Sequence, residues 1–95
     1  MASLRVKQGM CACCGRSTTL TFHHLIPKKL HRRAYFQRHF NKMQLNAGIN
    51  ICRACHDGIH NAYDEMQLAK GFSTLDSLLA DEGLKRHFAW VAKQK

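Results

Sequence analysis

Four histidines arranged in two pairs are the residues whose types and spacing indicate chemistry. The first pair, His23 and His24, lies in the segment TFHHLIP, and the second, His56 and His60, lies in CRACHDGIH. Two histidines four residues apart share one face of a helix and supply half of a metal site. His23 would be the third ligand, and three protein ligands leave coordination positions open for water and substrate, as catalytic metal sites do.

His24 is the histidine that this arrangement leaves outside the set of metal ligands. It follows His23 in an extended segment, where neighbouring side chains point to opposite faces, so only one of the two can reach the ion. An imidazole titrates near neutral pH, which suits a general base. In a rival arrangement, His56 supports a structural zinc beside Cys55. We disfavour it because the cysteines already complete that site.

Two Cys-x-x-Cys pairs predict a second, structural metal site. The four cysteines of these pairs are Cys11, Cys14, Cys52 and Cys55. Four thiolates form a closed tetrahedral zinc site. Cys13 is the remaining cysteine and an alternative ligand to Cys14, which we favour because Gly15 follows it in the expected turn. The alternative is that the cysteines are free and buried as small hydrophobic residues.

The bulk composition indicates a nucleic-acid partner. The chain has 95 residues, with 15 Lys and Arg against 6 Asp and Glu, for a formal net charge of +9. Its length suits one domain, and its positive charge favours nucleic acid or another polyanion. The odd number of cysteines, 5 in all, argues against a disulfide framework, and no apolar run is long enough to span a membrane. We therefore expect a reducing cytoplasm and no membrane partner.

A basic segment follows the first histidine pair directly. The residues expected to contact the nucleic-acid backbone are Lys28, Lys29, Arg32, Arg33 and Arg38. Such contacts position a nucleic acid without reading its sequence. Tyr35 would stack on bases, whereas Phe36 and Phe40 are expected in the core. The alternative for the charges is an ordinary solvated face.

Two strands and several helices would have to position these residues. The β-branched and aromatic run at 18–22 predicts a strand that leads into the first histidine pair, and the alternation at 47–51 predicts a second. A turn is expected at 52–55, followed by a helix from Cys55 to Lys70 that ends at Gly71. Ser73 with Asp76, and then Asp81, would cap two C-terminal helices that form core. These helices carry Leu75, Leu78, Leu79, Leu84, Phe88 and Val91.

Taken together, CACCG, TFHHLIP and CRACHDGIH resemble the HNH endonuclease family with its ββα-metal (His-Me finger) motif. The resemblance implies an α+β fold in which a two-stranded antiparallel hairpin packs on a helix with the metal between them. It implies that His23, His56 and His60 bind the catalytic ion and that His24 is the base. The chain would be a single domain, 1–95, with a zinc-stapled core at 11–63 and a helical C-terminal extension at 64–95.

The sequence departs from the family pattern at two places. His23 stands where many members carry Asp, and three neutral imidazoles prefer Zn²⁺, Mn²⁺ or Ni²⁺ over Mg²⁺, which we keep as an alternative. The middle Asn of the family, which orients the base through hydrogen bonds to backbone, has two candidates. We favour Asn46 and keep Asn50 as second choice, with the alternative that either is a simple turn residue.

The resemblance implies metal-dependent hydrolysis of DNA phosphodiester bonds that leaves a 5′-phosphate and a 3′-hydroxyl. A non-catalytic zinc-binding module for nucleic acids is the competing hypothesis, and His24, an imidazole beyond the three ligands, argues against it. A third hypothesis makes the chain a subunit of a larger phage or restriction assembly. The sequence leaves open RNA as substrate and a homo-oligomeric state.

Overall fold

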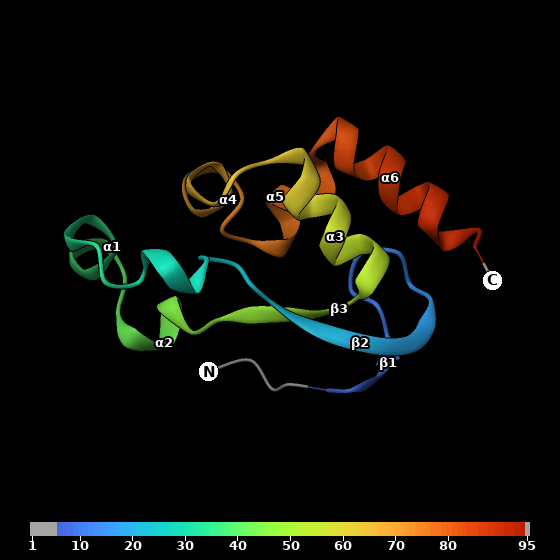
Figure 1. The fold of residues 1–95 in the computed structure, drawn as a ribbon, viewed down its shortest axis with the longest axis horizontal. Helices are drawn as coiled ribbons and strands as arrows, with labels where there is room; N and C mark the ends of the chain where they lie inside the picture. The colour runs from blue at the N-terminus through green and yellow to red at the C-terminus, as the bar shows by residue number, and fades with distance from the viewer. Residues whose placement is uncertain (1–5, 95) are drawn as a thin grey trace.

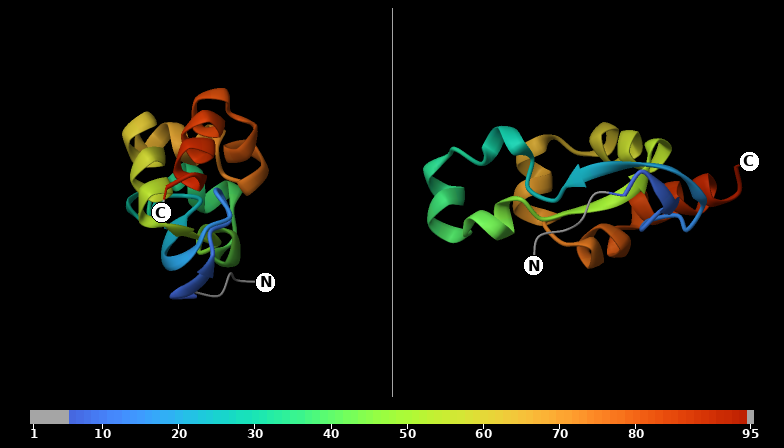
Figure 2. Two further views of the ribbon diagram at one scale, coloured as in Figure 1. Left: turned by 90° about the vertical axis from the view of Figure 1, so that its right-hand side faces the viewer. Right: turned by 90° about the horizontal axis from the view of Figure 1, so that it is seen from below.

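The computed structural model describes residues 6–94 and has the α+β architecture that the sequence predicted. Its strands are β1 (Gln8–Met10), β2 (Ser17–His24) and β3 (Gly48–Cys52). They form an antiparallel sheet in the order β1-β2-β3. The sheet lies along the long axis of the molecule, and the later helices gather on one side of it (Figure 1, Figure 2).

The helices form two groups. They are η1 (Lys28–Leu30), α1 (Ala34–His39), α2 (Lys42–Leu45), α3 (Arg53–Ala62), α4 (Glu65–Gly71), α5 (Leu75–Ala80) and α6 (Glu82–Ala92). The first three belong to an arm that connects β2 to β3 at one end of the molecule (Figure 1). Helix α3 contacts both long strands and α6. No helix within residues 6–94 is long and apolar enough to cross a membrane.

The pairing of β2 with β3 decides which side chains approach α3. His23 pairs with Ile49, and Thr21 pairs with Ile51. Because side chains alternate along a strand, Thr21 and His23 share one face of the sheet, and that face meets α3.

Gly48 pairs with His24. A Cβ at Gly48 would lie 2.5 Å from both the His23 carbonyl oxygen and the Phe22 ring, so only glycine fits this close approach.

The single helix predicted from Cys55 to Lys70 is wrong. Helix α3 ends at Ala62 and α4 begins at Glu65. Asp64 starts the second helix, because its carboxylate accepts a hydrogen bond from the Gln67 backbone and its own N–H donates to the Gln67 side chain. Such a reciprocal capping box satisfies two backbone donors that a helix start would otherwise leave unpaired.

Other predicted helix boundaries differ from the observed ones by smaller amounts. The predicted turn at 52–55 is wrong, since α3 already begins at Arg53. The expected cap at Ser73 lies one residue later, at Thr74, which forms its capping box with Ser77. The cap at Asp81 is confirmed by a 3.0 Å hydrogen bond from the Leu84 N–H. Strand β1 was not predicted, because three largely exposed residues carry no recognisable alternation.

The hydrophobic core lies between the sheet and the later helices. It is formed largely by Leu20, Ile51, Ile59, Leu68, Leu78, Leu84, Phe88 and Val91. A second cluster supports the arm and comprises Ile26, Leu30, Phe36 and Ala69, with Phe40 packed against it. The predicted core roles of α6, Phe36 and Phe40 are therefore confirmed.

Helices α3 and α6 approach closely at Gly58. The His87 imidazole donates from Nε2 to the Ala54 carbonyl at 3.0 Å, and a Cβ at Gly58 would lie 2.2 Å from that Nε2. We expect Gly58→Ala to lower the free energy of unfolding by about 1–3 kcal/mol, because the new methyl displaces the ring and breaks its hydrogen bond. Urea titration of the purified protein measures this change.

Gly71→Ala is the matched control for Gly58→Ala. Nothing lies within 4 Å of a Cβ at Gly71, which is also the last residue of a helix. Its free energy of unfolding should stay the same or rise by up to about 1 kcal/mol, since alanine favours helix. Equal stability of both variants would contradict the close contact between the two helices.

Candidate metal centres and the basic surface

The four predicted zinc ligands come together in the structure. The sulfur atoms of Cys11, Cys14, Cys52 and Cys55 all lie within 4.8 Å of one another. All five cysteines of the described chain are free thiols. The cysteines come from the turn that precedes β2 and from the junction at which β3 passes directly into α3. This cluster has the ligand number and type of a closed zinc site and fits a structural metal such as zinc.

The Cys11 sulfur accepts several hydrogen bonds within the cluster. It accepts backbone N–H groups from Cys13 and Cys14 at 3.4 Å and from Cys52 at 3.3 Å. Hydrogen bonds from the Cys13 and Cys55 side chains, reinforced by these amides, hold the pKa of Cys11 well below its usual range. The contact with Cys11, together with burial, raises the pKa of Cys55. Such crowded thiols can all ionise together only beside a cation.

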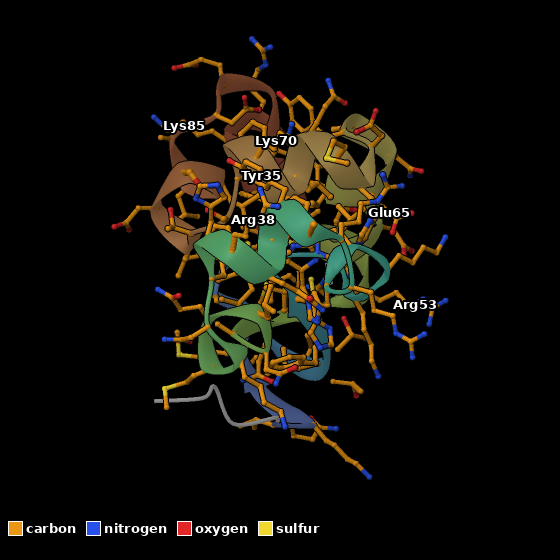
Figure 3. The ribbon with its side chains drawn as sticks, turned by 90° about the vertical axis from the view of Figure 1, so that its left-hand side faces the viewer. Tyr35, Arg38, Arg53, Glu65, Lys70 and Lys85 are labelled. Carbon is orange, nitrogen blue, oxygen red and sulfur yellow. The ribbon has the colours of Figure 1, made fainter. Side chains whose placement is uncertain are left out.

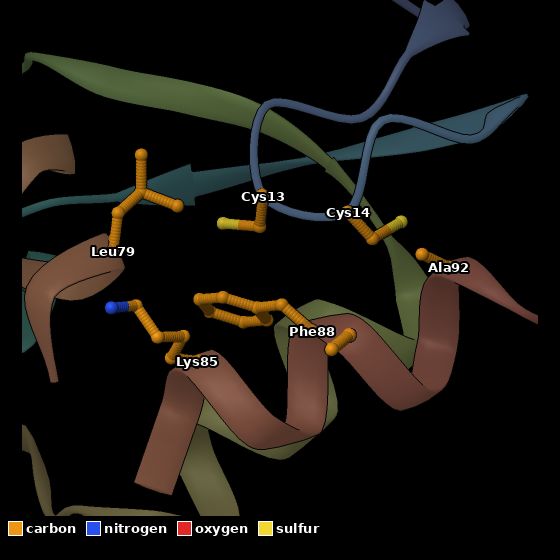
Figure 4. A pocket seen from close by; sticks show the side chains of 7 residues that line it. Cys13, Cys14, Leu79, Lys85, Phe88 and Ala92 are labelled. Carbon is orange, nitrogen blue, oxygen red and sulfur yellow. The ribbon is translucent and has the colours of Figure 1, made fainter. Parts of the chain in front are cut away.

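Cys13 lies outside the group of four. It is half-buried and lines a groove of about 320 Å³ with Phe88, Leu79 and Lys85. Figure 4 shows the Cys13 thiol turned toward Leu79 and the Cys14 sulfur pointing the other way. Its place agrees with the prediction that Cys14, and not Cys13, completes the cluster.

The three predicted histidine ligands also come together. One ring nitrogen from each of His23, His56 and His60 lies within 4.8 Å of the others. The His23 ring centroid is 5.2 Å from each of the other two, which are 5.0 Å apart. Strand β2 supplies His23, and the first and second turns of α3 supply the other two at a spacing of four residues.

His23 is the buried member of this triad. It is 1% exposed, and within residues 6–94 neither of its ring nitrogens has a hydrogen-bond partner. Burial, followed by the neighbouring His56 and His60, lowers the pKa of His23 to about 3. Burial also lowers the pKa of His56. A neutral imidazole that is buried without a partner is costly, and metal coordination would satisfy it.

Sequence reasoning missed one neighbour of the triad, Thr21. Its hydroxyl lies 2.8 Å from Nδ1 of His56 and 3.0 Å from the carbonyl oxygen of Ile51. The sequence held one signal for this contact: Thr21 lies two residues before His23, so both side chains lie on the same face of the strand. The contact with His56 spans 35 residues of chain and depends on how α3 packs against β2.

His24 is half-buried and borders the triad from another side. Its ring makes an edge contact with Phe22 at 5.0 Å between centroids and lies 5.9 Å from His31. His24, His56 and His60 line one pocket of about 250 Å³. The remaining lining residues are Phe22, Pro27, Lys28, Lys29 and Glu65. The structure therefore brings all four predicted histidines to one place, and it adds a carboxylate, Glu65, that sequence reasoning missed.

Asn46 and Asn50, the two candidates for the middle Asn, lie in different surroundings. Asn46 is exposed at the end of α2, two residues before Gly48, whose strand partner is His24. Asn50 lies within β3, and its side-chain oxygen accepts the Val6 N–H at 2.8 Å. Asn50 thus ties Val6 to the sheet, whereas Asn46 is close in sequence to the strand partner of His24.

The predicted basic residues are all exposed, but only some adjoin the histidine pocket. Lys28 and Lys29 line that pocket, and with Arg32 they line a neighbouring hollow of about 410 Å³. Lys29 pairs with Glu65 at 3.3 Å. Arg33 and Arg38 are exposed farther along the arm.

Tyr35, which was expected to stack on bases, is exposed on α1 and lies beside Lys70. It is 49% exposed, and the Lys70 ammonium lies 5.2 Å from its ring centroid. Figure 3 shows Tyr35 and Arg38 on the arm, with Lys70 beside Tyr35. The aromatic ring is therefore half exposed to solvent next to one cation.

Comparison with known proteins gives one informative relative. No family model and no solved structure matches the chain. The uncharacterized protein YisB of Bacillus subtilis (strain 168) is 32% identical over 87 residues, which is 90% of this chain and 76% of YisB. At this identity and coverage, the chain belongs to the same protein family as YisB.

Proposed function

We propose that this protein is a metal-dependent endonuclease of the HNH type that hydrolyses phosphodiester bonds in DNA. The observation that carries the proposal is His23, buried beside His56 and His60 without a hydrogen-bond partner among the described residues. A fourth imidazole, His24, opens into the pocket that the other two line. A module that only binds nucleic acid has no use for this arrangement.

His23, His56 and His60 are the residues that would hold the catalytic ion. A bound divalent cation would supply positive charge against the phosphate as negative charge grows on it during attack. The donor set consists of three imidazoles, which favours Zn²⁺, Mn²⁺ or Ni²⁺ over Mg²⁺. Residues 6–94 contain no cluster of carboxylates that would hold a pair of metals.

His24 acts as the general base. Its imidazole takes a proton from water, and the water oxygen forms a bond to phosphorus as the bond to the 3′ oxygen breaks. The departing 3′ oxygen takes a proton from solvent, so the products are a 5′-phosphate and a 3′-hydroxyl. Lys28 and Lys29 hold the substrate backbone at the pocket. The four cysteines would hold a zinc ion that ties the turn before β2 to the start of α3.

A plasmid-nicking assay tests the proposal directly. Supercoiled DNA is incubated with the zinc-loaded protein and added Mg²⁺, Mn²⁺, Ni²⁺ or Zn²⁺, with His60→Ala as the control for the histidine site. Cleavage by the unmodified protein that is lost in His60→Ala supports the endonuclease. DNA binding without cleavage under every metal would leave the non-catalytic module as the function.

The two lysines of the pocket should make a measurable contribution to the salt dependence of DNA binding. Each phosphate contact contributes about one to the slope of log K against log salt concentration, so Lys28→Ala/Lys29→Ala should reduce the slope by about two. Fluorescence anisotropy over a potassium chloride series measures it. The control, Lys85→Ala/Lys93→Ala on and just after α6, removes the same charge away from the pocket. A matching loss of slope in the control would refute a localised DNA site.

A further inference from the structure

We infer that Thr21 is a positioning residue, whose hydroxyl holds the His56 imidazole in the form protonated at Nδ1 and so reserves Nε2 for a metal ion. This inference rests on the proposed function in taking His56 as a ligand. It gives a role to Thr21, the first residue of the segment TFHHLIP, that the spacing of the histidines does not indicate. The contact that carries it joins Thr21 Oγ1 to His56 Nδ1 at 2.8 Å.

The direction of the hydrogen bonds follows from the chemistry of the three groups. The Thr21 hydroxyl has one hydrogen, and it lies 3.0 Å from the Ile51 carbonyl oxygen, which can only accept. With its hydrogen directed there, Oγ1 has only lone pairs to offer to His56. The imidazole must therefore donate from Nδ1, and its remaining lone pair is on Nε2.

The sheet orients the threonine, and the threonine in turn orients the histidine. Thr21 and Ile51 are cross-strand partners, and Ile51 is fully buried, so the carbonyl that receives the hydroxyl is fixed. A β-branched side chain in a strand also has restricted χ1 freedom. Thr21 and His23 share one face of β2. One strand thus supplies both a ligand and the group that aligns a second ligand from α3.

A metal-bound histidine generally donates its other ring N–H to a fixed acceptor, and loss of that acceptor typically costs about 10–100-fold in metal affinity. The same role for Thr21 predicts different results for two substitutions. Thr21→Val keeps the shape and β-branching but removes the hydroxyl, whereas Thr21→Ser keeps the hydroxyl and removes the methyl. The valine variant should weaken metal binding at the histidines by about 10–100-fold, and the serine variant by less than about threefold.

Calorimetric titration of Ni²⁺ into protein that already holds its cysteine-bound zinc measures this affinity. His60→Ala identifies which binding event belongs to the histidines, because that event should disappear. Wild-type affinity in Thr21→Val would overturn the inference. Equal losses in the valine and serine variants would also overturn it, since they would indicate a packing effect.

The imidazole tautomer provides a second readout that needs neither activity nor the catalytic ion. Long-range ¹H–¹⁵N NMR of the zinc-loaded protein at slightly alkaline pH should show His56 protonated at Nδ1, and Thr21→Val should lose this preference. Protonation at Nε2 in the unmodified protein would overturn the role of Thr21. If the unmodified protein neither binds Ni²⁺ at the histidines nor cleaves DNA, the proposed function fails, and the tautomer alone decides the assignment of Thr21.

Discussion

Replacement of His24 by alanine is expected to reduce the rate of phosphodiester cleavage by about 10²–10⁴-fold, the usual contribution of a positioned general base. DNA binding should remain, because Lys28 and Lys29 are unchanged. The imidazole lines the pocket beside His56 and His60 without belonging to the group of three. Its removal should therefore leave the metal content of the protein intact. Plasmid-nicking rates and anisotropy on the same DNA separate the two effects.

His39→Ala is the matched control for His24→Ala. His39 is an exposed imidazole on α1 whose ring lies 4.4 Å from that of Tyr35, and it lies in the same basic arm. Its removal should change the nicking rate by less than twofold. A His24→Ala protein that cuts DNA at the wild-type rate would show that another group takes the proton from water.

Loss of one ligand from the cysteine cluster should unfold the domain. Cys55 is fully buried in the main core, and Cys55→Ser leaves three thiols where four would surround the ion. Structural zinc contributes about 10–16 kcal/mol in zinc-finger peptides, comparable with the whole stability of a small domain at about 5–15 kcal/mol. We expect zinc content to fall below one ion per chain and the cooperative thermal transition to disappear. Elemental analysis and circular dichroism measure these two results.

Cys13→Ser provides the matched control within the same turn. Its thiol borders the groove over Phe88 and lies outside the group of four (Figure 4). This variant should retain its zinc and melt within a few degrees of the unmodified protein. A Cys55→Ser protein with the same melting temperature would mean that the cysteines act as small hydrophobic residues, the alternative to a zinc site.

Local patterns were enough to identify the candidate ligands. The spacing of His56 and His60 matches one turn of a helix, and α3 does carry both. Two Cys-x-x-Cys pairs, separated by 37 residues between Cys14 and Cys52, do converge in the fold. The spacing within each pair could be predicted because it is a local property, whereas the convergence of the two cysteine pairs depends on the fold. The break between α3 and α4 was missed although Asp64 and Gln67 are a local capping pair, because the apolar periodicity continues across it.

The amino-acid sequence by itself determined the ligand types, their local spacing and the positive charge of the arm. Only the tertiary structure decided that His24 shares a pocket with the second histidine pair, that Glu65 borders it, and that Thr21 contacts His56. These relations join residues about 32 to 41 positions apart in the chain. They depend on the register of β2 with β3 and on the packing of α3 and α4. That packing depends on contacts among buried side chains throughout the core, and no short motif encodes them.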